Sequence, residues 1–215
     1  IAAPLDALGA AALHRSQRRR GPLGVLPLVA PDVGGGEDAG AAGHDHRDVA
    51  RGDAIPEEPL LFLKAPSALN HPGGEIVYPP QSKRVDHEAE LVVVIGRTAK
   101  NVKARDAAAH ILGYSCINDV TARDLQIKDV QYTRAKGFDT FAPIGPWIET
   151  DLDPSALPVR CLVNGEVRQD GNTREMGATV PRLVEFISAV MTLFPGDVIA
   201  TGTPPASAPC RWATW

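Results

Sequence analysis

Polar and apolar positions change their pattern abruptly within residues 85–96, VDHEAELVVVIG. Residues 91–95 are apolar and rich in β-branched side chains, which predicts a strand buried on both faces. Side chains on a strand point alternately to its two faces, so Glu88 and Glu90 should share a face, and Asp86 should join them. Carboxylates held side by side repel one another and therefore require a cation, a shared proton or abundant water.

Further strands are expected along the second half of the chain. Residues 75–79 and 114–120 have the composition of strands, and 195–204 predict a turn, a short strand and a glycine-containing loop. The alternating segment 159–169 is centred on Asn164-Gly165, a dipeptide typical of a two-residue hairpin turn.

Helical spacing is found in two segments. Residues 104–114 are expected to form a helix that ends at Gly113. Residues 179–193 form the clearer pattern, with Thr179 as N-cap, Pro181 in the first turn and apolar residues on one face. Several strands with two helices indicate a strand-dominated α+β fold.

The chain divides by composition into three parts. Residues 1–57 are rich in Ala, Gly, Pro and Arg and have little periodicity, so we expect an atypical, partly disordered region there. Its RSQRRR run at 15–20 is read as a solvated charge run, with a transit peptide as the alternative. Residues 58–204 have the pattern of a globular domain, and 205–215 form a short, dissimilar tail.

The bulk properties exclude several classes of protein. The 215 residues suit one domain, or one domain with an appendage, and 44% hydrophobic residues are enough for a core. A net charge of −4 gives no basis for nucleic-acid binding. Only three cysteines, widely scattered, favour a reducing compartment and hence the cytoplasm. No apolar run approaches the roughly 18–20 residues that span a membrane.

Candidate chemistry is concentrated in three segments. The first holds Glu88 and Glu90, the second is NDVTARDLQ with Asp119, and the third is TRAKGFDTF with Lys136. If Asp119 meets the two glutamates, the site offers three hard oxygen ligands, which suit Mg²⁺, Mn²⁺ or Ca²⁺ and disfavour Zn²⁺. The alternative is a rim of solvated acidic residues beside a strand.

Six motifs occur in an order that identifies a family. They are FLKAPSAL, VDHEAELVVVIG, GYSCINDVTARDLQ, TRAKGFDTFAPIGPWI, VNGEVRQDGNT and PGDVIATGTP. Together they resemble the fumarylacetoacetate hydrolase family, in its small bacterial, acylpyruvase-like branch. The resemblance covers residues 57–204 and implies a mixed β-roll fold, a homodimer and a small-molecule 2-oxo acid substrate.

The resemblance also implies a metal site. It assigns a Mg²⁺ or Mn²⁺ ion to Glu88, Glu90 and Asp119, which would explain why these carboxylates lie together. In this family the substrate presents a 2-oxo acid or its enol to the ion, and the metal stabilises the enolate.

Four further residues match family positions that act on the substrate. Lys136 matches the active-site lysine, whose ammonium polarises a carbonyl or stabilises negative charge. Arg123 and Gln126 match residues that hold a substrate oxygen, and Thr203 matches a residue that binds the substrate carboxylate. The alternatives are a solvated Lys136, an Arg123 paired with Asp124 or another nearby acid, and a Thr203 that is an ordinary turn residue.

The resemblance implies a metal-dependent enzyme that hydrolyses a C–C bond in an acylpyruvate-like compound. Decarboxylation or enol–keto isomerisation of a related intermediate of aromatic catabolism is the nearest alternative, because these reactions share the metal and the enolate. A catalytically impaired, truncated or frameshifted family member is a third alternative.

Two segments depart from the family pattern. The family's lid stretch, NYxDHAxE, supplies a His and a Glu that activate water, but Val49 and Gly52 occupy those positions here, although Asp48 fits. The general base is therefore unassigned. The tail departs as well. Residues 204–215 can be back-translated into GC-rich codons. When that DNA is translated in the reading frame that starts two bases later, it gives Ala-Ser-Val-Gly-Pro-Met-Pro-Val-Gly-Asp-Leu, which is like the family's continuation. We therefore expect a single-base deletion near Pro204 and an aberrant tail with exposed Trp212 and Trp215.

Overall fold

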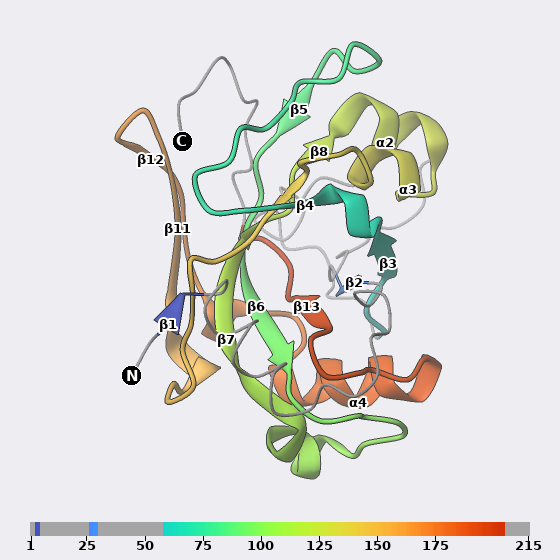
Figure 1. Cartoon of the computed structure of the whole chain (residues 1–215), viewed down its shortest axis with the longest axis vertical. Coiled ribbons are helices and arrows are strands. Elements are labelled where there is room, and N and C mark those ends of the chain that lie inside the picture. Colours follow the sequence, from blue (N-terminus) through green and yellow to red (C-terminus); the bar gives the residue numbers. More distant parts are fainter. Residues whose placement is uncertain (1–2, 5–25, 30–57, 205–215) are drawn as a thin grey trace.

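The computed structural model describes residues 3–4, 26–29 and 58–204 (Figure 1). The strands are β1 Ala3–Pro4, β2 Leu26–Val29, β3 Leu61–Lys64, β4 Leu69–Asn70, β5 Val85–Asp86, β6 Ala89–Ile95, β7 Ile111–Asn118, β8 Thr121–Ala122, β9 Ala142–Pro143, β10 Trp147–Ile148, β11 Pro158–Val163, β12 Glu166–Asn172 and β13 Val198–Ala200. The α-helices are α2 Arg123–Asp129, α3 Thr133–Lys136 and α4 Val180–Val190. Short 3₁₀ helices are η2 Pro66–Ala68, η3 Ala104–His110, η4 Pro154–Ala156 and η5 Thr173–Glu175. This composition confirms the strand-dominated α+β prediction.

The predictions for the lid positions Asp48, Val49 and Gly52 lie outside the described residues, as do those for the tail 205–215. The boundaries proposed at residues 58 and 204 stay predictions.

An antiparallel sheet in the order β13-β6-β7 forms the centre of the molecule (Figure 1). Strand β6 lies in the middle, where its residues 91–95 are buried, as their β-branched composition predicted. Leu91, Val93 and Ile95 belong to one apolar cluster, whereas Val92 and Val94 belong to another. The strand is therefore buried on both faces, and its even-numbered positions face the cluster that also contains residues of β8 and α3.

Helix α4 covers the odd-numbered face of β6. Its buried residues Val180, Leu183, Val184 and Ile187 recur at helical spacing and pack in the same cluster as Leu91 and its neighbours. Thr179 occupies the N-cap position, where its carbonyl accepts the Leu183 N–H, but its side chain makes no capping bond. The helix ends at Val190 rather than at 193, because Leu193 pairs instead with Ala99 as an isolated bridge.

The hairpin β11–β12 follows its prediction closely. The strands pair from Pro158↔Asn172 to Val163↔Glu166, which leaves a two-residue turn. Both turn residues, Asn164 and Gly165, have positive φ angles, 53° and 80°. This conformation explains the strong Asn-Gly preference at such turns.

Two predicted elements differ in the structure. Residues 75–79 form no strand. Residues 104–114 do not form one α-helix: a 3₁₀ helix ends at His110, and β7 then begins at Ile111. Gly113 is therefore a strand residue, paired with Val94, and not a helix cap. A Cβ on Gly113 would lie 2.5 Å from the Glu149 carbonyl oxygen, so this glycine allows a close approach of two chain segments.

The strand predicted at 114–120 is present as β7, but it begins and ends earlier, running from Ile111 to Asn118. Across the described part of the chain, no helix has the length and apolar character needed to cross a membrane.

Candidate metal centre

The three predicted metal ligands meet where β6 begins and β7 ends. Ala89 pairs with Asn118 in the antiparallel register, so Glu88 and Glu90 lie beside Asp119. The Asp119 N–H donates to the Glu88 carbonyl at 2.8 Å, which joins the two segments at this point. One carboxylate oxygen from each of the three residues lies within 4.8 Å of the others. All three side chains are buried, so the alternative of a solvated acidic rim is wrong.

Asp86 does not join this group, contrary to the alternation argument. It lies on the separate strand β5, which pairs with β8, while residues 87–88 belong to no strand. The period of two therefore does not continue from Asp86 to Glu90. Instead, Asp86 accepts hydrogen bonds from Arg84 and from Arg123 Nε, the latter at 2.9 Å.

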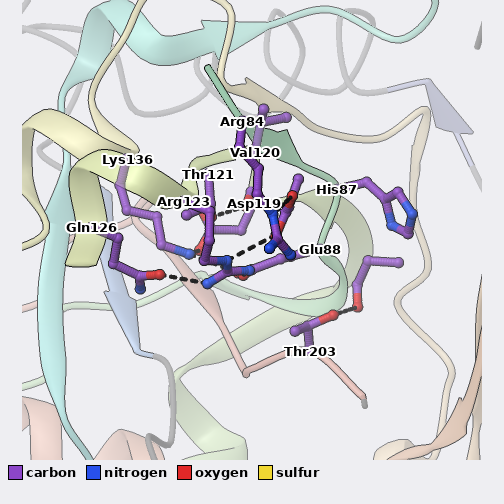
Figure 2. A network of polar contacts seen from close by, with 12 residues as sticks. Arg84, His87, Glu88, Asp119, Val120, Thr121, Arg123, Gln126, Lys136 and Thr203 are labelled. Carbon is purple, nitrogen blue, oxygen red and sulfur yellow. Dashed lines mark hydrogen bonds and ion pairs between the residues drawn. The ribbon is translucent and has the colours of Figure 1, made fainter. Parts of the chain in front are cut away.

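Three buried cations surround the carboxylates. Lys136 Nζ lies 2.6 Å from Glu88 Oε2 and 2.6 Å from Asp119 Oδ2. Lys64 Nζ lies 2.6 Å from Asp119 Oδ1, and Arg123 forms an ion pair with Glu88 Oε1. Figure 2 shows the side chains of Lys136, Arg123, Glu88 and Asp119 converging on one region. The repulsion inferred from the sequence is thus offset in part by the protein's own cations.

The two lysines differ in their electrostatic surroundings. Burial alone would lower the pKa of Lys136, but the carboxylates of Asp119 and Glu88 outweigh it and raise that pKa above its usual value. Lys136 is therefore an ammonium. Burial lowers the pKa of Lys64, and the charge of Lys136 adds to this effect, although Asp119 opposes it. Lys64 is thus the more easily deprotonated of the two.

Glu90 is the least compensated member of the group. Its Oε2 accepts the Gly202 N–H at 2.8 Å, whereas its buried Oε1 has no hydrogen-bond partner among the residues that the structure describes. Burial raises the pKa of the Glu90 carboxyl well above its usual value of 4.5, and the charges of Asp119 and Glu88 raise it further. A divalent cation would satisfy this oxygen, and three carboxylates are the ligands that Mg²⁺ and Mn²⁺ prefer. The residues therefore fit the predicted ion.

Arg123 and Gln126 lie on α2, next to the carboxylates. Arg123 pairs with Asp86 and Glu88, so the alternative that it binds a nearby acid is confirmed, although the acid is not its neighbour Asp124. Burial would lower the pKa of Arg123, but Glu88 and Asp86 raise it above its usual value. Arg123 also donates to Gln126 Oε1, which fixes the direction of the half-buried Gln126 amide (Figure 2).

Thr203 lies in the loop after β13, one residue beyond the Gly202 that contacts Glu90. Its hydroxyl donates to the Ala89 carbonyl at 2.9 Å and accepts from Gln169 Nε2 at 2.8 Å. The single hydroxyl proton is therefore used within the protein. The substrate-binding roles of Thr203, Arg123, Gln126 and Lys136 stay predictions.

Two buried residues of this region were not identified from the sequence. Lys64 ends strand β3 and is 1% exposed, and Gln169 on β12 is also 1% exposed. Both stand within quoted motifs, FLKAPSAL and VNGEVRQDGNT. A lone lysine that ends an apolar strand was the available signal for Lys64. The alternating pattern of the hairpin assigns Gln169 to one face, but the sequence does not indicate which face of the hairpin is buried.

The chain has many similarities to known proteins. The family model described as Fumarylacetoacetate (FAA) hydrolase C-terminal matches residues 36–213. An uncharacterized protein of Methanocaldococcus jannaschii is 56% identical over 151 residues, which are 70% of this chain and 64% of that protein. Oxaloacetate tautomerase FAHD2A, mitochondrial, of Homo sapiens is 47% identical over 156 residues, 70% of this chain and 50% of that protein.

The fold is similar to that of solved structures. The crystal structure of 5-carboxymethyl-2-hydroxymuconate delta-isomerase from Mycobacterium smegmatis matches with a TM-score of 0.74 and 47% identity, over 86% of this chain and 69% of that chain. The chain thus spans between half and about two-thirds of the length of these three relatives.

Because the family model matches most of the chain, and the six motifs lie within the matched residues, the chain belongs to the fumarylacetoacetate hydrolase family.

Proposed function

We propose that this protein is a metal-dependent enzyme that converts a 2-oxo acid through its enolate. The observation that carries the proposal is the buried group of Glu88, Glu90 and Asp119, in which Glu90 Oε1 has no hydrogen-bond partner within the described residues. These residues would hold a Mg²⁺ or Mn²⁺ ion. When bound, the ion would supply a Lewis acid that accepts the carboxylate and keto oxygens of the substrate and lowers the energy of the enolate.

Lys136 is the residue proposed to act on the substrate. The carboxylates of Asp119 and Glu88 raise its pKa in the metal-free protein, which favours the ammonium form, and an ammonium can donate a hydrogen bond or stabilise negative charge. Its Nζ also lies 4.9 Å from the centre of the Phe62 ring, so its surroundings contain little water. A fixed ammonium in such surroundings stabilises a developing oxyanion more strongly than it would in water.

Gln126 and Arg123 are proposed to orient the substrate together. Arg123 is engaged by Asp86 and Glu88, and it holds Gln126 Oε1, so the Nε2 end of the Gln126 amide is the part that can donate to a substrate oxygen. Arg123 then acts mainly by holding Glu88 and Gln126 in place. Thr203 would contribute through the position of its loop, since its hydroxyl proton is given to Ala89.

Two reactions involve a stabilised enolate, as the intermediate in isomerisation and as the leaving group in hydrolysis. Enol–keto isomerisation needs a proton to leave the enol oxygen and a C–H bond to form at the adjacent carbon. Hydrolysis of a C–C bond also needs a water molecule and a base that activates it, and Val49 and Gly52 stand where the family supplies its His and Glu. The human relative named a tautomerase and the mycobacterial structure named an isomerase support the first reaction. The family description supports the second.

We therefore place isomerisation of a 2-oxo acid first and hydrolysis of an acylpyruvate-like compound second, with decarboxylation, which also produces an enolate when CO₂ leaves, as a third reaction. The purified chain should be given oxaloacetate, acetylpyruvate and fumarylpyruvate, with Mn²⁺ or with a chelator. With oxaloacetate, loss of enol absorbance without pyruvate or CO₂ reports isomerisation, and release of CO₂ together with pyruvate reports decarboxylation. With acetylpyruvate or fumarylpyruvate, release of pyruvate without CO₂ reports hydrolysis. Acceleration that requires Mn²⁺ is the expected result.

Failure to accelerate any of the three reactions, in protein that binds Mn²⁺, would overturn the proposal and favour the catalytically impaired family member. The homodimer and the cytoplasmic location are further proposals that follow from the family resemblance and the cysteine usage. Sedimentation of the purified chain tests the first.

A further inference from the structure

One buried amide connects the segment that carries Glu88 and Glu90 to the loop that carries Thr203. Gln169 lies on β12, and its side chain makes four hydrogen bonds. Its Oε1 accepts from the Ala89 N–H at 3.0 Å and contacts His87 Nδ1 at 3.0 Å. Its Nε2 donates to Thr203 Oγ1 at 2.8 Å and to the Pro204 carbonyl at 3.0 Å. An amide has two donor hydrogens and two acceptor lone pairs, so Gln169 is saturated.

The partners fix which way the amide points. The Pro204 carbonyl can only accept and the Ala89 N–H can only donate, so the Gln169 nitrogen must face Pro204 and the oxygen must face Ala89. His87 Nδ1 therefore carries the hydrogen that points to Gln169 Oε1. One ring proton of His87 is thus placed on Nδ1.

All four partners are next to residues of the proposed site. His87 and Ala89 precede and follow Glu88, and Ala89 precedes Glu90. Thr203 and Pro204 follow Gly202, whose N–H holds Glu90 Oε2. The Thr203 hydroxyl then returns to the Ala89 carbonyl at 2.9 Å. The Gln169 side chain therefore connects the backbone just before Glu90 to the loop whose Gly202 N–H binds the Glu90 carboxylate.

The backbone of the hairpin supports this connection. A Cβ on Gly171, two residues along β12, would lie 2.3 Å from the Pro204 Cβ. Only glycine allows β12 to come this close to the loop, so this approach and the amide contacts of Gln169 bring the same two segments together.

We propose that Gln169 is a positioning residue of the metal centre: it holds the segment of Glu88 and Glu90 at a fixed distance from the loop of Gly202 and Thr203. The proposal rests on the proposed metal site. Residues that orient metal ligands typically change metal affinity by about 10–100-fold when they are replaced.

The first test replaces Gln169 with methionine, which has similar length but cannot make the four hydrogen bonds. The dissociation constant for Mn²⁺ should rise at least about tenfold in Gln169→Met, measured by titration of the full chain at a temperature where it is folded. The matched control is Gln131→Met, the same replacement at an exposed position, which should bind Mn²⁺ like the wild type. Equal Mn²⁺ affinity in Gln169→Met and the wild type would overturn the proposal.

A loss of stability alone must be separated from a loss of positioning. Ile187→Val removes a methyl group from the cluster under α4, away from Gln169, and should lower the melting temperature without changing Mn²⁺ affinity. If the Mn²⁺ affinity of Ile187→Val falls as far as that of Gln169→Met, affinity follows general stability and the proposal is wrong.

Two variants keep the test decisive if Gln169→Met does not fold. Gln169→Glu keeps the oxygen that accepts from Ala89 and contacts His87, but replaces the donor nitrogen with an oxygen opposite Thr203 and the Pro204 carbonyl. Gly171→Ala leaves Gln169 intact and pushes Pro204 away. Both should weaken Mn²⁺ binding, and wild-type affinity in both would overturn the proposal.

A spectroscopic measurement tests the same arrangement directly. The ¹⁵N chemical shifts of the wild-type His87 ring should show protonation at Nδ1, and the shifts should change in Gln169→Met. Protonation at Nε2 alone in the wild type would contradict the assigned contact. Wild-type protein that binds no Mn²⁺ would overturn the proposed function and this inference together, whereas unchanged binding in the variants would overturn only the inference.

Discussion

Lys64 Nζ lies 2.6 Å from Asp119 Oδ1, and neither side chain is exposed to solvent. The pair joins the end of β3 to the end of β7, 55 residues apart in the chain. Lys64 also donates to the Val120 carbonyl at 3.2 Å, so it holds both the side chain of Asp119 and the backbone beside it. This lysine thus shares Asp119 with Lys136, which binds the other carboxylate oxygen.

Replacing Lys64 should destabilise the metal-free protein. Lys64→Met leaves a buried carboxylate with one cation fewer, and breaking such a pair costs about 3–5 kcal/mol in the free energy of unfolding. Urea unfolding in the presence of a chelator measures this loss. Lys128→Met, at an exposed position of α2, should change the same free energy by no more than about 0.5 kcal/mol. If the two variants unfold alike, Lys64 has no role in balancing the charge of Asp119.

Replacing Glu90 should have opposite effects on stability and metal binding. Its raised pKa means that the metal-free fold favours the neutral carboxyl, so any contribution to stability from this group is present at low pH and lost as the pH rises. Glu90→Gln is neutral at every pH and should raise the melting temperature of the metal-free protein at pH 7. It should also weaken Mn²⁺ binding, because one negative ligand is lost. The two measurements are thermal unfolding with a chelator and Mn²⁺ titration.

The comparison variant is Glu88→Gln. Glu88 is paired with both Arg123 and Lys136, so neutralising it should lower the melting temperature of the metal-free protein. A rise in both variants, or a fall in both, would contradict the different charge environments of the two glutamates.

Lys136 should affect turnover more than substrate binding. Lys136→Met removes an ammonium proposed to stabilise an oxyanion, and loss of one such donor lowers kcat by about 10²–10³. Steady-state kinetics should therefore show a large fall in kcat with a smaller change in KM. Because Lys136 also pairs with Glu88 and Asp119, the variant needs a Mn²⁺ titration. If metal affinity falls as far as turnover, the lysine has a structural role instead.

Asp124 should make the stability of the protein depend on pH in the acidic range. Its burial opposes ionisation, but hydrogen bonds from Ser82 and from the Lys83 and Leu125 N–H groups lower its pKa below the usual value of 3.8. A carboxyl whose pKa is lowered in the folded state stabilises the fold above its usual pKa and loses that effect as the pH falls toward the folded value. Asp124→Asn should therefore be less stable than the wild type at pH 7.

The difference between wild type and Asp124→Asn should shrink as the pH falls below 3.8. Urea unfolding across the acidic range measures it. If the difference in the free energy of unfolding does not change with pH, the variant is destabilised by lost packing or hydrogen bonds, and the charge of Asp124 makes no contribution.

Local patterns in the sequence determined those parts of the fold that depend on neighbouring residues. Asn164-Gly165 predicted the hairpin because the turn requires two positive φ angles, and 179–193 predicted α4 because its apolar face is continuous. Residues 91–95 predicted a strand buried on both faces. The ordered motifs identified the family, and with it the carboxylates that the structure brings together.

Only the tertiary structure decided which polar groups pair. Alternation placed Asp86 with the glutamates, but a break between β5 and β6 turns it toward Arg123. Gly113 has the position expected of a helix cap, yet the structure needs a glycine there because a side chain would collide with the Glu149 carbonyl of a distant segment. Lys64 pairs with Asp119, 55 residues away. Gln169 binds residues that lie between 34 and 82 positions away in the sequence. Local pattern shows that a side chain is polar, but the partner that offsets its burial is fixed only when distant strands pack together.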